Sequence, residues 1–161
     1  MKKIIKVLTS ALLLSLAMVF LPALNVHLNN GSGYSYAVTR YGYFSGSTGT
    51  MNSLYNSYSG PQQSRVYSIT SPTLPLDSKT TTVIANVTFS SSGAPFNLYV
   101  KSPDGRLASR LISSSTQVTF DEFANERADG KWQVYIVTTS TNPMLPSTGS
   151  ARLTFNYKYE Q

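Results

Sequence analysis

The chain has 161 residues, of which 41% are hydrophobic, 12% aromatic and 12% charged, and its formal net charge is +6. This composition is too apolar for a disordered chain, and ten glycines and eight prolines interrupt any long coiled coil. The absence of cysteine excludes disulfides, thiolate metal sites and cysteine nucleophiles. The length predicts one domain with room for a short additional segment.

The first 37 residues have the pattern of an export signal. A basic start is formed by Lys2, Lys3 and Lys6. The uncharged apolar stretch Val7–Leu24 follows, and small residues at Ser35 and Ala37 suit a signal peptidase. We therefore expect a secreted protein, cleaved after Ala37, with Leu21–Ala23 as a poorer cleavage site. The alternative is an uncleaved membrane anchor, because the apolar stretch is just long enough to span a bilayer.

Cleavage after Ala37 would leave ten basic and seven acidic residues and a net charge of +3. These basic residues are scattered singly, which argues against a nucleic-acid partner, and we expect no membrane contact after cleavage. The one histidine, His27, would leave with the signal, so neither a Ser-His-Asp triad nor a His/Cys zinc site can form. We expect no enzyme. A hydrolase that uses only carboxylates is the weakest alternative.

Residues 38–64 are rich in Gly, Ser, Asn and Tyr and show no long alternation of apolar and polar residues. We expect an edge hairpin that turns at Ser45–Gly49, or an arm. Tyr41, Tyr43 and Tyr58 are the candidate ligand-binding residues, as a sugar-stacking or adhesive patch. The alternative is that these tyrosines are half buried in the hairpin.

Residues 65–161 alternate apolar and polar side chains with a period of two, which predicts half-buried strands. The alternating stretches are Val83–Phe89, Phe96–Lys101, Trp132–Ile136 and Leu153–Tyr159. Turn sequences such as Ser102–Gly105 separate them, and the only helical candidate is a turn at Phe123–Arg127. The pattern predicts an all-β fold, an antiparallel β-sandwich or a barrel, with Trp132 in the core.

The carboxylates cluster at one place, in a loop with Asp121, Glu122, Glu126 and Asp129. Four such side chains within nine residues are a candidate calcium site, and Ca²⁺ is the only cofactor that we consider. Arg127 lies in the same loop and would oppose a cation. The alternative is a solvated loop with a local Glu–Arg pair.

Leu145–Gly149 reads Leu-Pro-Ser-Thr-Gly, the pattern of sortase-anchored wall proteins. That signal needs a hydrophobic span and a basic tail after it. Only twelve residues follow, and they alternate as a strand. We therefore expect a loop before a final strand and no wall anchor.

A series of features follows in order from Val83 to Phe155. They are the apolar strand Val83–Val87, the strand Phe96–Lys101 with its Ser102–Gly105 turn, Leu107 and Leu111, Phe120 and Phe123, the Gly130–Trp132 strand start, and Gly149. In this order the segment resembles the P-domain (P/Homo B) that accompanies subtilisin-like proprotein convertases. The resemblance implies a jelly-roll-like, galactose-binding-like β-sandwich that helps a protease to fold or stay stable. The chain departs from the family pattern at Phe89, at Ala94–Leu98 and at Val137–Thr139.

The functional prediction is a secreted, non-catalytic β-sandwich module that binds or stabilises an extracellular protein or a cell-surface glycan. The alternative is a small secreted antibacterial or competitor-directed effector, whose +3 charge would engage an anionic envelope. A growth-inhibition assay on neighbouring bacteria distinguishes the two predictions. Capture of a binding partner tests the first prediction directly.

Overall fold

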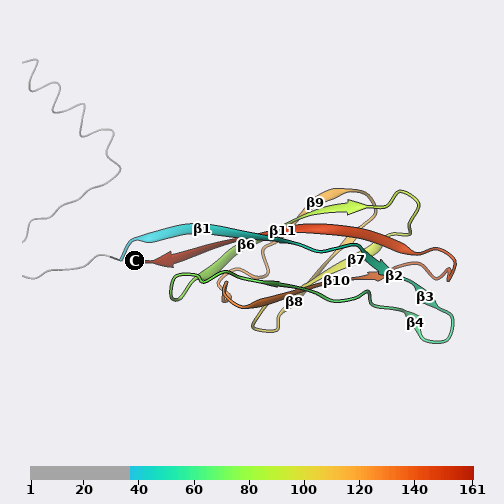
Figure 1. The fold of residues 1–161 in the computed structure, drawn as a ribbon, viewed down its shortest axis with the longest axis horizontal. Helices are drawn as coiled ribbons and strands as arrows, with labels where there is room; N and C mark the ends of the chain where they lie inside the picture. Colours follow the sequence, from blue (N-terminus) through green and yellow to red (C-terminus); the bar gives the residue numbers. More distant parts are fainter. Residues whose placement is uncertain (1–36) are drawn as a thin grey trace, which may run out of the picture. The chain divides into compact units, whose positions relative to one another are not determined.

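The computed structural model describes residues 37–161, which form one unit (Figure 1). The expected export signal, up to Tyr36, lies outside the described residues. Residues 37–161 form strands, turns and loops, and they contain no helix long and apolar enough to cross a membrane.

The first sheet has the strand order β1-β11-β6-β9, and every pairing in it is antiparallel. Its strands are β1 (Thr39–Ser47), β11 (Ser147–Glu160), β6 (Lys79–Phe89) and β9 (Thr116–Phe120). The short strand β2 (Met51–Ser53) pairs with the start of β11. The long strand β11, red in Figure 1, thus lies between β6 and the two strands β1 and β2.

The second sheet has the order β5-β10-β7-β8 and is also antiparallel. Its strands are β5 (Tyr67–Thr70), β10 (Lys131–Thr138), β7 (Phe96–Lys101) and β8 (Leu107–Ile112). A separate hairpin of β3 (Tyr55–Asn56) and β4 (Gly60–Pro61) projects at one end of the molecule (Figure 1).

The core lies between the two sheets and contains the apolar side chain of every second strand residue. In β10, for example, Trp132, Val134 and Ile136 are fully buried, whereas Gln133 and Tyr135 point outwards. The buried cluster also includes Phe44, Phe96, Leu98, Phe120, Phe123, Leu153 and Phe155. The all-β antiparallel sandwich and the core position of Trp132 are therefore confirmed. The expected helical turn at Phe123–Arg127 is instead a pair of tight turns, in which Asn125 has a φ of 67°.

The N-terminal segment differs from the expected hairpin at Ser45–Gly49. β1 and β2 do not pair with each other, because both run along the same side of β11. Between the pairs Ser47–Arg152 and Met51–Gly149 this side has one residue more than β11, as in a β-bulge. Phe44 and Met51 are buried, so the segment contributes to the core of the sandwich. Its Gly/Ser-rich composition hides this role, because only every second residue needs to be apolar.

Serine hydroxyls accept hydrogen bonds from the backbone amides of β10 beyond the point where β5 ends. β5 pairs with Lys131–Val134 only, and the remaining amides of β10 need other acceptors. The amide of Ile136 donates to Ser64 Oγ at 3.0 Å, and the amide of Thr138 donates to Ser53 Oγ at 2.7 Å. Segment 53–64 is thereby fixed to the second sheet as well as to the first.

Candidate functional site

Two tyrosines stack on the outer face of the second sheet. Tyr99 on β7 and Tyr135 on β10 are directly opposite each other in the strand register. Their ring centroids are 5.0 Å apart and the rings are within 8° of parallel. Because their neighbours Val100 and Val134 point into the core, the alternation of the strands directs both tyrosines away from it. The pair is therefore a half-buried aromatic stack at the centre of this face.

Two exposed leucines on the edge strand β8 lie diagonally to Tyr99, with Lys101 and Asn97 as their direct partners in the register. Leu107 is 49% exposed and Leu111 is 63% exposed, and the intervening Ser109 lies directly opposite Tyr99. The three β8 residues alternate with the inward-facing Ala108 and Ile112. Aromatic and aliphatic side chains that are clustered on a solvated sheet face are typical of contact surfaces. We call Tyr99, Tyr135, Leu107 and Leu111 the tyrosine–leucine face.

Tyr135 is uncharged at neutral pH. Burial raises the pKa of Tyr135, and the proximity of Tyr99 raises it further. Its hydroxyl therefore keeps its proton and can donate a hydrogen bond to a partner.

Sequence reasoning missed this face. The alternation placed Tyr99 between Leu98 and Val100, and Tyr135 between Val134 and Ile136, on the outer side of two strands. Two aromatic residues at outward positions were the available signal. Tyr99 and Tyr135 stack because of the register between β7 and β10. The alternation of residues within one strand does not determine that register.

The three predicted ligand-binding tyrosines are exposed but are not brought together. Tyr41 and Tyr43 are 75% and 72% exposed on β1, and Tyr58 is fully exposed in the turn between β3 and β4. The start of β1 and the β3–β4 hairpin lie at opposite ends of the sandwich (Figure 1). The three tyrosines therefore do not form a shared patch.

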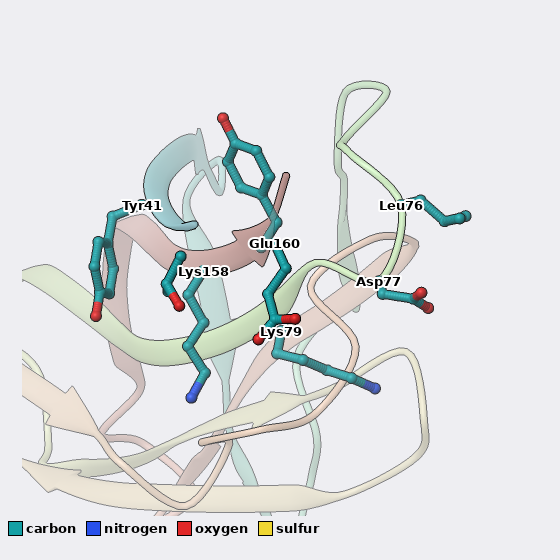
Figure 2. Close-up of a pocket in the computed structure, with 8 residues that line it drawn as sticks. Tyr41, Leu76, Asp77, Lys79, Lys158 and Glu160 are labelled. Carbon is teal, nitrogen blue, oxygen red and sulfur yellow. The ribbon is translucent and has the colours of Figure 1, made fainter. Parts of the chain in front are cut away.

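Tyr41 instead lines a cavity of about 440 Å³ between the ends of β1, β6 and β11 (Figure 2). Lys79 and Lys158 are directly opposite each other in the register and also line it. Asp77 and Glu160 contribute carboxylates to the same cavity. The balance of two cations and two carboxylates favours neither an anionic nor a cationic ligand.

The carboxylates of the acidic loop bind different partners. Glu122 forms two hydrogen bonds with Arg110, at 2.7 and 2.8 Å, and this pairing lowers the pKa of Glu122. The other three contacts are Glu126 with Arg106 at 3.4 Å, Asp129 with Arg127 at 3.3 Å, and Asp121 with the hydroxyl of Thr82 at 3.0 Å. Within residues 37–161 no three of the acidic side chains form a group that could hold a metal ion. Calcium binding at this loop stays a hypothesis for experiment.

No protein-family model matches the chain, and no curated protein matches it. Among solved structures it is similar to FlhE, with 16% identity and a TM-score of 0.48 over 74% of this chain and 96% of FlhE. It is also similar to the serine protease of Aeromonas sobria, with 13% identity and a TM-score of 0.46 over 79% of this chain and 28% of the protease chain. A third similarity is to a chain in the complex of that protease with the chaperone ORF2. It has 14% identity and a TM-score of 0.47 over 89% of this chain and 29% of that one.

The chain thus spans less than a third of the length of the two Aeromonas sobria chains that it resembles. At these identities and TM-scores, the similarities carry no conclusion about function.

Proposed function

We propose that this protein is a secreted, non-catalytic β-sandwich module that binds an extracellular protein through its tyrosine–leucine face. The observation that carries the proposal is the stacked pair of Tyr99 and Tyr135 beside the exposed leucines of β8. Tyrosine is enriched at protein interfaces because its ring buries a large apolar area while its hydroxyl still finds a polar partner.

The chemistry of the face favours a protein over a glycan. In the parallel stack each tyrosine covers one face of the other, so one face of each ring is left for a ligand. Leu107 and Leu111 have no polar atoms for sugar hydroxyls, but they suit the apolar centre of a protein interface. The strands beneath hold all four side chains in position, so binding orders little of the backbone.

The other parts of the proposal rest on the sequence. Residues 37–161 contain neither histidine nor cysteine, the side chains on which most acid–base and nucleophilic catalysis at neutral pH depends. Export rests on the signal pattern of residues 1–37. The resemblance of residues 83–155 to the P-domain family makes a subtilisin-like protease one partner to test.

The experiment is a comparative capture. The full chain is expressed, and the form that the cells secrete is immobilised and exposed to culture supernatant of the same host and to cell-wall glycan. We expect a defined supernatant protein to bind the wild type and not the double variant Leu107→Ser with Leu111→Ser. Ile84→Ser is the matched control, because Ile84 faces outwards from β6 on the other sheet. Capture that is equal for all three proteins, or binding to glycan alone, would contradict the proposal.

A further inference from the structure

Within residues 37–161, β1 is the terminal strand of the first sheet, with β11 as its neighbour. Val38 and Gln161 exchange both of their backbone hydrogen bonds, at 3.0 and 3.2 Å. Because such pairs alternate along an antiparallel ladder, Arg40, Gly42, Phe44 and Gly46 also direct their amides towards β11. The amides and carbonyls of Thr39, Tyr41, Tyr43, Ser45 and Ser47 therefore face away from the sheet.

The opposite side of the sandwich is protected against further strand pairing. There Arg110 on β8 reaches across to β9 and donates from Nε to the carbonyl of Thr119 at 3.1 Å. The same guanidinium lies 4.8 Å from the centre of the Phe120 ring and pairs with Glu122. Inward charges, prolines and lysines are the usual means by which edge strands avoid pairing.

β1 has little of this protection within its nine residues. It contains no proline and no lysine, and its one charged residue is Arg40, close to its beginning. The remaining residues of β1 are Thr, Ser, Gly, Tyr and Phe, and its two most exposed aromatic side chains are Tyr41 and Tyr43. An edge of this length with a single charge near its beginning is a template for another strand.

We propose that β1 pairs antiparallel with β1 of a second copy of this chain, around a two-fold axis at Tyr43. This register uses every outward-facing residue of the strand. It places Tyr43 opposite Tyr43 of the second copy, Tyr41 opposite Ser45, and Thr39 opposite Ser47. The first sheets of the two copies then form one continuous sheet.

The occupant is a second copy because the strand is complementary to itself in this register. Arg40 lies opposite Gly46, so no like charges meet. Tyr41 and Tyr43 are on the same face of the strand. In this register Tyr43 lies directly opposite Tyr43 of the second copy, and Tyr41 is a diagonal neighbour of that same residue. The two most exposed aromatic side chains of β1 are thereby covered. A single strand pair is small for an interface, so the dimer forms reversibly with rising concentration.

The test measures the mass of the secreted form of the full chain by sedimentation equilibrium over a range of concentrations. The wild type should change from monomer to dimer. Tyr43→Lys and Tyr43→Glu should each stay monomeric at concentrations where the wild type is dimeric, because like charges then meet at the axis. An equimolar mixture of the two variants should dimerise again at low salt. A register that places residue 43 against itself explains that recovery.

Two further variants separate pairing from folding. Tyr43→Pro removes an amide that points away from β11, so the sheet is retained while two intermolecular hydrogen bonds are lost. Because two hydrogen bonds are lost, dimerisation should weaken by roughly thirtyfold. Asn156→Lys adds the same charge one strand further in, opposite Tyr43, and should leave the dimer intact. A wild type that is monomeric throughout, or a Lys/Glu mixture that stays monomeric while both variants are folded by circular dichroism, would overturn the proposal.

Discussion

Trp132 lies edge-on against Phe123, with ring centroids 5.2 Å apart and planes at 89°, and its indole N–H donates to the carbonyl of Ala128 at 3.1 Å. The same indole packs against Phe155 on the other sheet, with ring centroids 4.7 Å apart. One side chain thus connects β10, the acidic loop and β11. It is fully buried and has its polar atom satisfied, as a core tryptophan requires.

Trp132→Ala should therefore cost about 3–5 kcal/mol of unfolding free energy, the usual range for truncating a buried large aromatic residue. Chemical denaturation followed by far-UV circular dichroism measures this loss, with Trp132→Phe as the milder comparison. The wild type contains one tryptophan, so its emission should be blue-shifted and weakly quenched by iodide. A red-shifted, easily quenched emission would place the indole in solvent instead.

Alternation within single strands predicted the sandwich and its core, because the apolar residues of β6, β7, β10 and β11 repeat with a period of two. The interpretation of residues 38–64 was wrong about the turn at Ser45–Gly49. Gly46 lies close against Ile69, where a side chain would not fit, so a glycine that resembles a turn residue is a packing residue. Two partners of the acidic loop, Arg110 and Thr82, come from β8 and β6, and such distant contacts have no local signature in the sequence.

Gly149 is a second glycine that packing explains. A Cβ at this position would lie 2.8 Å from both Phe96 Cζ and the carbonyl oxygen of Thr88, and the carbonyl belongs to the neighbouring strand. Gly149→Ala should destabilise the fold by about 1–3 kcal/mol through overpacking. Thermal and urea unfolding measure the effect, and Ser150→Ala is the control on the outward side. Equal stability of Gly149→Ala and the wild type would show that the sheet adjusts freely.

The Arg110–Glu122 pair should make a small, pH-dependent contribution to stability. The hydrogen bond from Arg110 lowers the pKa of Glu122 in the folded protein. The contribution is therefore present at neutral pH and is lost as the pH falls below the ordinary glutamate pKa of about 4.3 and through the lowered value. Both side chains are partly exposed, so Glu122→Gln should cost less than about 1 kcal/mol at pH 7.

Urea unfolding at several pH values checks this dependence. The difference between Glu122→Gln and the wild type should shrink towards zero in acid. Glu160→Gln, at the exposed end of β11, serves as the control. A difference that grows on acidification would contradict the assigned pairing.

Chelation tests calcium binding at the acidic loop. The carboxylates are held by three different arginines and by Thr82, so we expect the same melting temperature in chelator and in millimolar calcium. Calcium at a concentration of a hundred times its dissociation constant would add roughly 2.7 kcal/mol to the free energy of unfolding, which is easily detected. The hypothesis gains support only if calcium raises the melting temperature and the combined change Asp121→Asn with Asp129→Asn removes that rise.

The secreted protein should begin at Val38. The amide of Val38 donates to the carbonyl of Gln161 at 3.0 Å, so cleavage after Ala37 leaves the whole β1–β11 ladder intact. Intact mass spectrometry of protein from the culture supernatant measures the start. Protein that retains residues 1–37 and occurs only in membranes would instead indicate an anchor.

The position of β11 has a consequence for the order of folding. Its partners β1, β2 and β6 all precede it in the chain, and the pair of Thr39 and Glu160 joins positions more than a hundred residues apart. The first sheet thus has a gap at its centre until residues 147–160 are available, and such distant pairings form slowly. In a polypeptide that leaves the ribosome or a secretion channel from its N-terminus, β1 and β6 therefore cannot be joined into this sheet until β11 has emerged. In an exported protein, this delay would keep the chain threadable during transport and postpone folding until it reaches the other side.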